Sequence, residues 1–398
     1  MATQSQQATG IREKDAAYVL ATYPRAPFVL VHGEGMTVTD SEGKAYLDFA
    51  SGIAVNAFGH ADPAIVAAIQ EQVAQLGHVC NLYLSAPQAE LAEKLCSLSF
   101  ADKVFFCNSG AEAIEAAIKF ARKYALVNHG PGKTGIVAFE GAFHGRTLGA
   151  LAITPREKYQ APFRPLMPGA AIAPFNDVEA AEKLIGPGTC AVFVEPVQGE
   201  GGVHVATSEF LGALRELCDR HGALLVFDEI QCGLGRTGKL WAYEHSGVKP
   251  DMMALAKALG GGLPMGATLL TEAVASAVEV GDHGSTFAGG PVVARAAQVV
   301  LSRASDPATL AHVEAMGRLL AARLGAIGSP HVRDVRGMGL MLGIELDMDV
   351  RPIVEAGYAH GVIMLNAGPN VLRLLPPYIV TEREIDVLIQ VLARIIPS

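Results

Sequence analysis

The strongest constraint on the fold is an alternation of apolar, strand-like runs with helical patterns between about residues 66 and 292. The helical patterns include 111–127 and 209–220, in which apolar residues recur at the spacing of one helix face. Strand runs that are apolar throughout are typical of parallel sheets covered on both faces by helices. The strand candidates are Lys103–Cys107, Gly135–Phe139, Cys190–Val194, Ala223–Phe227, Met252–Ala256 and Ala267–Leu270. We therefore expect an α/β fold with a mostly parallel central sheet in a large domain.

Two other regions flank this pattern. The first region contains two short strand-like runs at 28–31 and 35–39, followed by a turn at Asp40–Gly43. The last region predicts a long helix from 293, a strand at Leu340–Leu346, a helix near 350–359 and a final helix from Glu382. The expected divisions are an N-terminal segment (1–65) that packs with the small domain, a large domain (66–292) and a small C-terminal α/β domain (293–398).

Composition excludes several classes of function. The 398 residues carry a net charge of −9 without a run of Lys or Arg, so a nucleic-acid partner is not expected. Apolar stretches are interrupted by charges, Gly or Pro before they reach about 18 residues, so we expect no membrane span. The polar first 14 residues do not resemble a signal peptide, and a cytoplasmic location is expected. The six scattered cysteines form no Cys-x-x-Cys pair, so we expect reduced thiols and no metal site.

The run from Asp251 to Gly262 is the most informative segment for chemistry. An apolar strand there leads to a single lysine, Lys257, followed by three consecutive glycines, Gly260 to Gly262. A lysine beside a buried strand is costly unless it is paired, neutral or used covalently. The glycines leave room for a flat ring to approach, although a lysine at a strand end can also simply extend its amine to solvent.

Three further segments place polar groups at strand ends. Asp228 ends an apolar strand, where open α/β sheets bind ligands. Ser109 can cap a helix, and with Glu112 it forms the Ser-x-x-Glu capping box, whose free N–H groups favour an anion. Phe143 and Arg146 lie on one loop. Together with Lys257, these groups match the requirements of pyridoxal 5′-phosphate, although each one taken alone has an ordinary structural explanation.

A competing pattern lies at Gly233–Gly238, which reads G-x-G-x-x-G and follows a strand. A dinucleotide site requires a helix directly after such a loop. The following segment contains Gly247 and Pro250 and has no clear helical face. A nicotinamide-dependent dehydrogenase therefore stays a remote alternative, and a cofactor-free interaction protein is a further one.

Six motifs resemble those of a known family and occur in that family's order. The chain resembles the class III (ω-amino) aminotransferases of fold type I, in particular the bacterial acetylornithine aminotransferases, from about Phe49 to Pro377. The motifs are Asn108–Ala113, Phe143–Arg146, Glu195–Gly202, Phe227–Gly233, Ala256–Gly262 and His283–Phe287. The expected fold is accordingly that of a fold type I transferase.

The resemblance implies a role for each matching residue. Lys257 would carry pyridoxal 5′-phosphate as an imine, and Asp228 would pair with the pyridine nitrogen. Gln231 would reach the ring hydroxyl, and Phe143 would stack on the ring. The other implied cofactor contacts are Ser109, Gly110 and Ala111 at the phosphate, Glu229 and Ile230 next to Asp228, and Thr286, which in this family reaches the cofactor phosphate of the other subunit. A homodimer with shared active sites is therefore implied.

The resemblance also implies the substrates. Arg146 would hold the substrate α-carboxylate, Ser285 would contact acetylornithine, and Arg373 would bind a carboxylate of 2-oxoglutarate, with Glu200 neutralising it in the amine half-reaction. The implied reaction moves the δ-amino group of N2-acetyl-L-ornithine to 2-oxoglutarate, in a ping-pong sequence. The position where ornithine aminotransferases carry a tyrosine is Ile53 here, which suits an acylated nitrogen. Alternative amines are N-succinylornithine, N-succinyl-diaminopimelate, ornithine, 4-aminobutyrate and putrescine.

Overall fold

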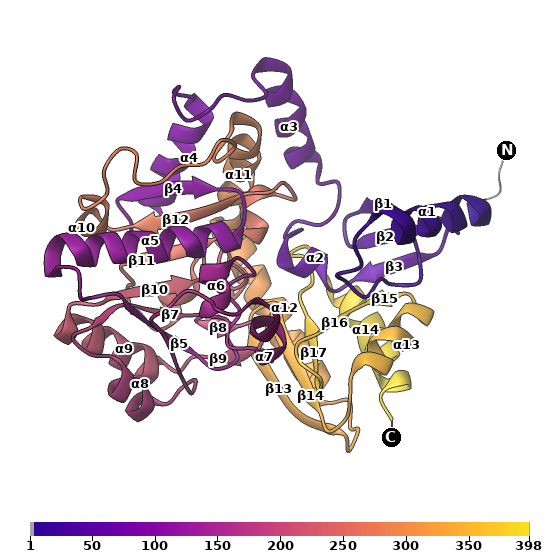
Figure 1. Ribbon diagram of the computed structural model, residues 1–398. Helices are drawn as coiled ribbons and strands as arrows, with labels where there is room; N and C mark the ends of the chain where they lie inside the picture. Colours follow the sequence, from indigo (N-terminus) through magenta and orange to yellow (C-terminus); the bar gives the residue numbers. More distant parts are fainter. Residues whose placement is uncertain (1–3, 398) are drawn as a thin grey trace.

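The computed structural model describes residues 4–397, and its centre is a seven-stranded sheet (Figure 1). In spatial order the strands are β4 (Lys103–Cys107), β12 (Gly266–Leu270), β11 (Met252–Leu255), β10 (Leu224–Asp228), β7 (Thr189–Val194), β5 (Gly135–Phe139) and β6 (Ala170–Ala173). Every pairing among β11, β10, β7, β5 and β6 is parallel, whereas β12 is antiparallel to both of its neighbours. The expected mostly parallel sheet is confirmed, with β12 as the reversed strand.

Helices cover this sheet on both faces, as its apolar strands predict. Alternate residues of β10 point to opposite sides: Leu225 and Phe227 join the core with α9 (Ser208–His221), and Leu224 and Val226 join the core with α5 (Gly110–His129). The other helices of this region are α3 (Pro63–Gln75), α4 (Ala86–Ser97), α6 (Leu148–Ala152), α7 (Glu157–Gln160), α8 (Val178–Leu184), α10 (Glu272–Ala275) and α11 (Pro291–Ala304). Three short 3₁₀ segments lie at Ala161–Phe163, Ala242–His245 and Lys257–Gly260.

The C-terminal region forms a smaller α/β unit. Its sheet has the order β13 (Val332–Met338), β14 (Met341–Leu346), β17 (Val371–Leu374) and β16 (Leu365–Asn366). The helices of this unit are α12 (Pro307–Gly325), α13 (Arg351–Ala359) and α14 (Glu382–Ile395). The strand near 340 and the helices at 351 and 382 therefore lie where the sequence predicts them.

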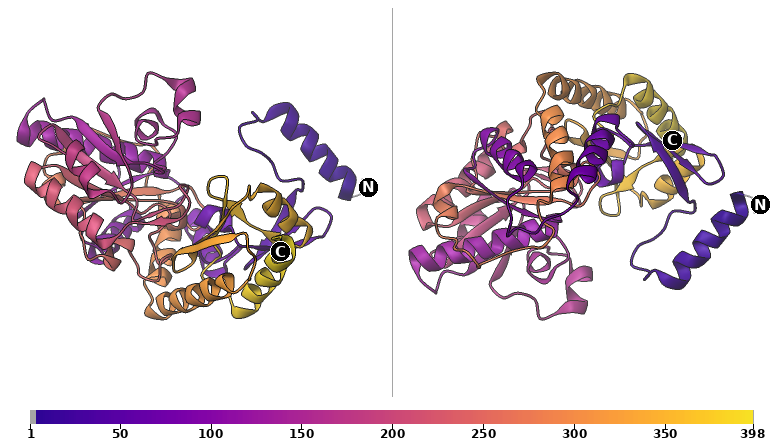
Figure 2. Two further views of the ribbon diagram at one scale, coloured as in Figure 1. Left: turned by 90° about the horizontal axis from the view of Figure 1, so that it is seen from below. Right: turned by 90° about the horizontal axis from the view of Figure 1, so that it is seen from above.

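The N-terminal strands lie beside this small unit (Figure 1). β1 (Leu30–Glu34), β2 (Thr37–Asp40) and β3 (Ala45–Asp48) form antiparallel pairs, and β3 pairs in parallel with β15 (Val362–Ile363). The short α2 (Ser51–Ala54) then leads to the large sheet, while α1 (Gln4–Tyr18) lies apart from the seven-stranded sheet (Figure 2). The domain bounds at 65 and 292 stay a prediction.

The prediction of one long helix from residue 293 is wrong, because the structure has two helices there, α11 and α12. Asp306 caps α12, its carboxylate accepting a hydrogen bond from Ala308 N at 2.8 Å, and Pro307 occupies the first helical position. A proline disfavours the α conformation in the preceding residue, so α11 ends at Ala304. The alanine-rich β6 and the short α6 and α7 were not predicted.

In the described chain, turns and a 3₁₀ segment at Ala242–His245 follow the Gly233–Gly238 loop. Among these described residues, no α-helix lies between this loop and β11. Arg236 of this loop is buried, donates to the Leu340 carbonyl oxygen at 3.2 Å and lies over the Tyr378 ring. The loop therefore joins the large sheet to the small unit. Among residues 4–397, no helix is long and apolar enough to cross a membrane.

Candidate active site

A cavity of about 460 Å³ lies where the parallel strands of the large sheet end. The end of β4, the loop after β5, the end of β10 and the turn after β11 all contribute to its wall. The residues predicted for the site that line it are Ser109, Gly110, Ala111, Phe143, Arg146, Glu200, Asp228, Ile230, Gln231 and Lys257. The topology thus brings together side chains that are far apart in the sequence.

Lys257 begins the turn after β11 with an unusual backbone. Its φ is +42°, in the left-handed region that residues other than glycine seldom adopt. Burial lowers the pKa of the Lys257 amine, and the negative charge of Glu200 opposes this shift. Within residues 4–397 the amine has no hydrogen bond or ion pair. These conditions favour the neutral, nucleophilic form of the amine.

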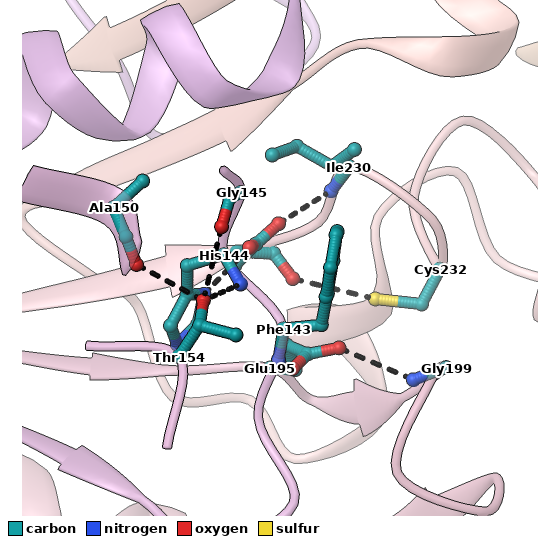
Figure 3. Close-up of polar contacts among 10 residues, drawn as sticks. Phe143, His144, Gly145, Ala150, Thr154, Glu195, Gly199, Ile230 and Cys232 are labelled. Atoms are coloured by element: carbon teal, nitrogen blue, oxygen red, sulfur yellow. Dashed lines mark hydrogen bonds and ion pairs between the residues drawn. The ribbon is translucent and has the colours of Figure 1, made fainter. Parts of the chain in front are cut away.

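Asp228 ends β10 and is held by two contacts. One carboxylate oxygen accepts a hydrogen bond from Ile230 N at 3.0 Å, and the other lies 2.7 Å from Nδ1 of His144 (Figure 3). Burial works against the charged imidazole, but the hydrogen bond to Asp228 and the charges of Asp228 and Glu195 raise the pKa of His144 overall. The His144 Nε2 atom is buried without a partner in the described chain. Asp228 and His144 therefore form a fixed polar pair at the cavity wall.

Glu195 ties together two loops of the site (Figure 3). Its carboxylate accepts hydrogen bonds from Phe143 N at 2.8 Å and from Gly199 N at 3.1 Å. Burial raises the pKa of Glu195 to about 7, and the positive charge of His144 opposes this rise. The loop that carries Phe143 and the turn that carries Glu200 are thus held by one buried carboxyl group.

The N-terminus of α5 opens onto the same cavity. Ser109 caps the helix, its Oγ accepting a hydrogen bond from Glu112 N at 3.2 Å. The reciprocal contact of the predicted capping box is shifted by one residue, because the Glu112 carboxylate accepts from Asn108 N. The first N–H groups of a helix have no partner within it, so this end suits an anion.

Glu200 and Arg373 form an ion pair between the two sheets. Arg373 lies on β17 and is only 2% exposed, and its Nη1 contacts the Glu200 carboxylate and, at 3.1 Å, Oε1 of Gln231. Burial raises the pKa of Glu200, whereas the positive charge of Arg373 lowers it. The net effect is a pKa below the ordinary value. The structure thus places Gln231, predicted to reach a ring hydroxyl, with its amide oxygen against Arg373.

Five residues named from the sequence lie outside the cavity lining: Arg373, described above, and Glu229, Ser285, Thr286 and Ile53. The Glu229 carboxylate accepts hydrogen bonds from Ala242 N at 2.7 Å and Tyr243 N at 2.8 Å. Its burial raises the pKa of Glu229 to about 8. Ser285 accepts a hydrogen bond at Oγ from Asn108 Nδ2 at 2.9 Å, whereas Thr286 and Ile53 are exposed. In a single chain these residues do not line the cavity, although Ser285 contacts Asn108, which does.

His144 and Glu195 lie in the predicted motifs, but sequence reasoning assigned no role to either. The available signal was their position: His144 follows Phe143 on a loop at the edge where β10 ends, and Glu195 directly follows β7. A histidine and a carboxylate at one edge of a parallel sheet are candidates for mutual contact. Among residues 4–397, no group of His, Cys, Asp or Glu is arranged to hold a metal ion.

A family model and the most similar known proteins point to the same family. Residues 18–396 match the family model described as aminotransferase class-III. The chain is 51% identical over 397 residues to the mitochondrial acetylornithine aminotransferase of Alnus glutinosa, covering 98% of this chain and 88% of that protein. It is 49% identical over 386 residues to the succinylornithine transaminase of Yersinia pseudotuberculosis, covering 94% and 93%.

Solved structures agree with this family. The ornithine aminotransferase of Toxoplasma gondii superposes with a TM-score of 0.94 at 30% identity, covering 99% of this chain and 95% of that one. The N-acetylornithine aminotransferase of Stenotrophomonas maltophilia superposes with a TM-score of 0.84 at 39% identity, covering 96% and 98%. The fold type I architecture expected from the sequence is thus confirmed.

Proposed function

Because this chain belongs to the class III aminotransferases, we propose that it binds pyridoxal 5′-phosphate at Lys257 and uses N2-acetyl-L-ornithine as its amine donor. The δ-amino group passes to 2-oxoglutarate, giving N-acetyl-L-glutamate 5-semialdehyde and L-glutamate. The family is one of pyridoxal-phosphate-dependent transaminases, and the residues around the cavity fit that cofactor.

The fit rests on three features of the cavity. The N-terminus of α5 opens onto the cavity, and the first N–H groups of a helix suit a phosphate. Asp228 offers a carboxylate, already held by His144, that suits a protonated ring nitrogen. The observation that carries the proposal is Lys257, a half-buried residue that lines the same cavity as these two features and whose amine has no hydrogen bond or ion pair within residues 4–397.

Bound pyridoxal 5′-phosphate would supply a carbonyl that condenses with amines and a ring that withdraws electrons. With the cofactor bound, Lys257 Nζ at the cavity wall would accept a proton from the reacting carbon of the substrate and return it as a general acid–base. Burial favours the neutral form of Lys257 needed to accept that proton. Asp228 would pair with the ring nitrogen of the cofactor, and His144, whose Nδ1 lies 2.7 Å from the Asp228 carboxylate, would fix the orientation of that carboxylate.

The substrate end uses the two arginines. Arg146 lines the cavity and is proposed to hold the α-carboxylate of the acylated amine by its planar, forked donors. Arg373 is paired with Glu200, so the charge of this arginine is neutralised towards an uncharged δ-amine arm. Opening of that pair would expose Arg373 to a carboxylate of 2-oxoglutarate.

N-succinylornithine is the second candidate donor, because a relative of nearly equal identity carries the name succinylornithine transaminase. The test is a panel of amines, including ornithine, assayed with the holoenzyme and 2-oxoglutarate. We expect the highest kcat/KM with N2-acetyl-L-ornithine. Equal or better turnover of ornithine would overturn the proposed preference for an acylated substrate.

We also propose a homodimer in which Thr286 reaches the partner's site. Exposed apolar side chains lie on two segments: Phe287 directly follows Thr286, and Leu82, Tyr83 and Leu84 follow Asn81. Asn81 Nδ2 connects the two segments by donating to the carbonyl oxygens of Ser285 at 3.0 Å and Ala288 at 3.1 Å. An exposed apolar patch of this kind supports burial against a second copy.

A mixed dimer tests this assembly. If Thr286 serves the other subunit, a hybrid of Lys257→Ala and Thr286→Ala chains has one site with both changes and one intact site. We expect about half of the wild-type activity from purified hybrids, well above either parent. Activity no higher than that of the Thr286→Ala parent would contradict the shared site. A cytoplasmic location is also proposed, and cell fractionation would test it.

A further inference from the structure

Arg146 lines the cavity without a polar partner. It precedes α6 and is exposed, and its guanidinium has no hydrogen bond or ion pair within residues 4–397. Its closest aromatic contact is with Tyr159, where Cζ of Arg146 lies 3.4 Å from the ring centroid. The Phe143 ring is more distant, at 5.7 Å. A flexible charged side chain at the cavity wall is thus oriented mainly by the face of one ring.

The short helix that carries Tyr159 is held in place by hydrogen bonds of the neighbouring residue. Tyr159 lies in α7, where the neighbouring Gln160 donates from Nε2 to the carbonyl oxygens of Leu151 at 2.9 Å and Thr154 at 3.1 Å. These bonds hold α7 against the end of α6. The beginning of α6 is held by Glu115, whose Oε1 accepts from two N–H groups of its first turn at 2.8 and 3.1 Å. The two segments that carry Arg146 and Tyr159 are therefore tied together.

A second arginine contacts the same ring. Arg156 Cζ lies 5.6 Å from the centroid of Tyr159, and its Nη2 donates to the backbone carbonyl oxygen of Glu200. The Glu200 side chain holds Arg373. Tyr159 thus lies between the arginine at the cavity wall and the arginine that holds the turn carrying Glu200.

We propose that Tyr159 is a positioning residue that holds the Arg146 guanidinium against its ring face, so that the donors of Arg146 remain available to the substrate carboxylate. A guanidinium stacked by its face keeps its in-plane N–H groups for bidentate binding. The electrostatic attraction of the ring face adds to this restraint. The inference rests on the proposed function of Arg146, and its test separates the two.

The test compares Tyr159→Leu with Tyr159→Phe in the holoenzyme. The probe is N-acetyl-L-norvaline, which keeps the acylated α-amino acid but has no δ-amine to react, and calorimetry measures its Kd. We expect Tyr159→Leu to weaken binding about fivefold, as for one partly exposed cation–π contact, and Tyr159→Phe to restore it. Phe163→Leu is the matched control, since this exposed ring lies in the next turn and does not line the cavity.

Kinetics give a second readout. The KM for N2-acetyl-L-ornithine should rise about fivefold in Tyr159→Leu with little change in kcat, the pattern of lost uniform binding. The half-reaction with putrescine, which has no carboxylate, should be unchanged. A purely structural defect would slow both amines and lower Tm. If Tyr159→Leu does not fold, Tyr159→Met replaces it at this half-buried position.

Two outcomes would overturn the inference. If Arg146→Gln weakens probe binding but Tyr159→Leu does not, or if Tyr159→Phe is as weak as Tyr159→Leu, ring stacking does not position Arg146 and the proposed function stands. If Arg146→Gln also leaves probe binding unchanged, the proposed role of Arg146 is wrong as well.

Discussion

The two ends of the cavity are built differently. At the proposed cofactor end, Asp228 is the last residue of β10 and Lys257 follows the adjacent parallel strand β11, and the contacts of Asp228 to His144 and Ile230 lie within the large unit. At the substrate end, Glu200 lies on a turn beside the large sheet and Arg373 lies on β17 of the small sheet. One end is fixed within a single rigid sheet, whereas the other depends on an ion pair between two units.

This difference has a kinetic consequence. Residues fixed on one sheet serve both halves of a ping-pong reaction, so changing them slows both halves alike. An ion pair that must open for one substrate and stay closed for the other affects the two halves unequally. The predictions below use this contrast, and rates of the separate half-reactions are their common measurement.

The largest effect is expected for Lys257→Ala. Removing the amine eliminates both the covalent carrier and the proton-transfer group, so both half-reactions should slow by about 10⁴-fold. Single-turnover absorbance of the loaded enzyme measures this, and Lys239→Ala, an exposed lysine, is the control. A half-reaction within about tenfold of the wild type would show that the cofactor end is misassigned.

Asp228→Asn should slow both half-reactions by about a hundredfold, because the amide cannot supply the negative charge held by His144. The ratio of the two half-reaction rates should stay close to that of the wild type. A selective loss with one substrate only would break the proposed contrast between the two ends.

Glu200→Gln should act on one half only. Without the carboxylate, Arg373 is a buried cation with no neutralising partner, and the N2-acetyl-L-ornithine half-reaction should weaken about tenfold. The 2-oxoglutarate half-reaction should be preserved or improved. Equal losses in both halves would show that the ion pair is structural rather than a switch.

The smallest effect is a pH dependence of stability. Burial raises the pKa of Glu195 from 4.5 to about 7, so the native protein keeps a proton that the unfolded chain loses in this range. Relative to Glu195→Gln, the wild type should lose about 1–3 °C in Tm as pH rises from about 5 to 8. The contribution of Glu200 to stability changes with pH in the opposite direction. Because the pKa of Glu200 is lowered in the fold, its charged form stabilises the protein above the ordinary carboxyl pKa, and this stabilisation is lost on acidification. If the difference in Tm between the wild type and Glu195→Gln does not change with pH, the raised pKa of Glu195 is contradicted.

The sequence predicts the cofactor end better than the rest. The apolar strands β10 and β11 end within a residue or two of the predicted bounds, and this alone brings Asp228 and Lys257 to one edge. The contact between His144 and Asp228 spans 84 positions and has no local pattern, so it could not be predicted. Glu229 immediately follows Asp228, yet its carboxylate binds the backbone near 242, because successive residues at a strand end point in different directions.

The most direct test of the central claim is chemical labelling of the cofactor-bearing lysine. The holoenzyme is reduced with borohydride, digested and analysed by mass spectrometry for the pyridoxyl-modified peptide. We expect the modification at Lys257, and its absence from the Lys257→Ala protein. Modification at another lysine, or none in an active enzyme, would contradict it.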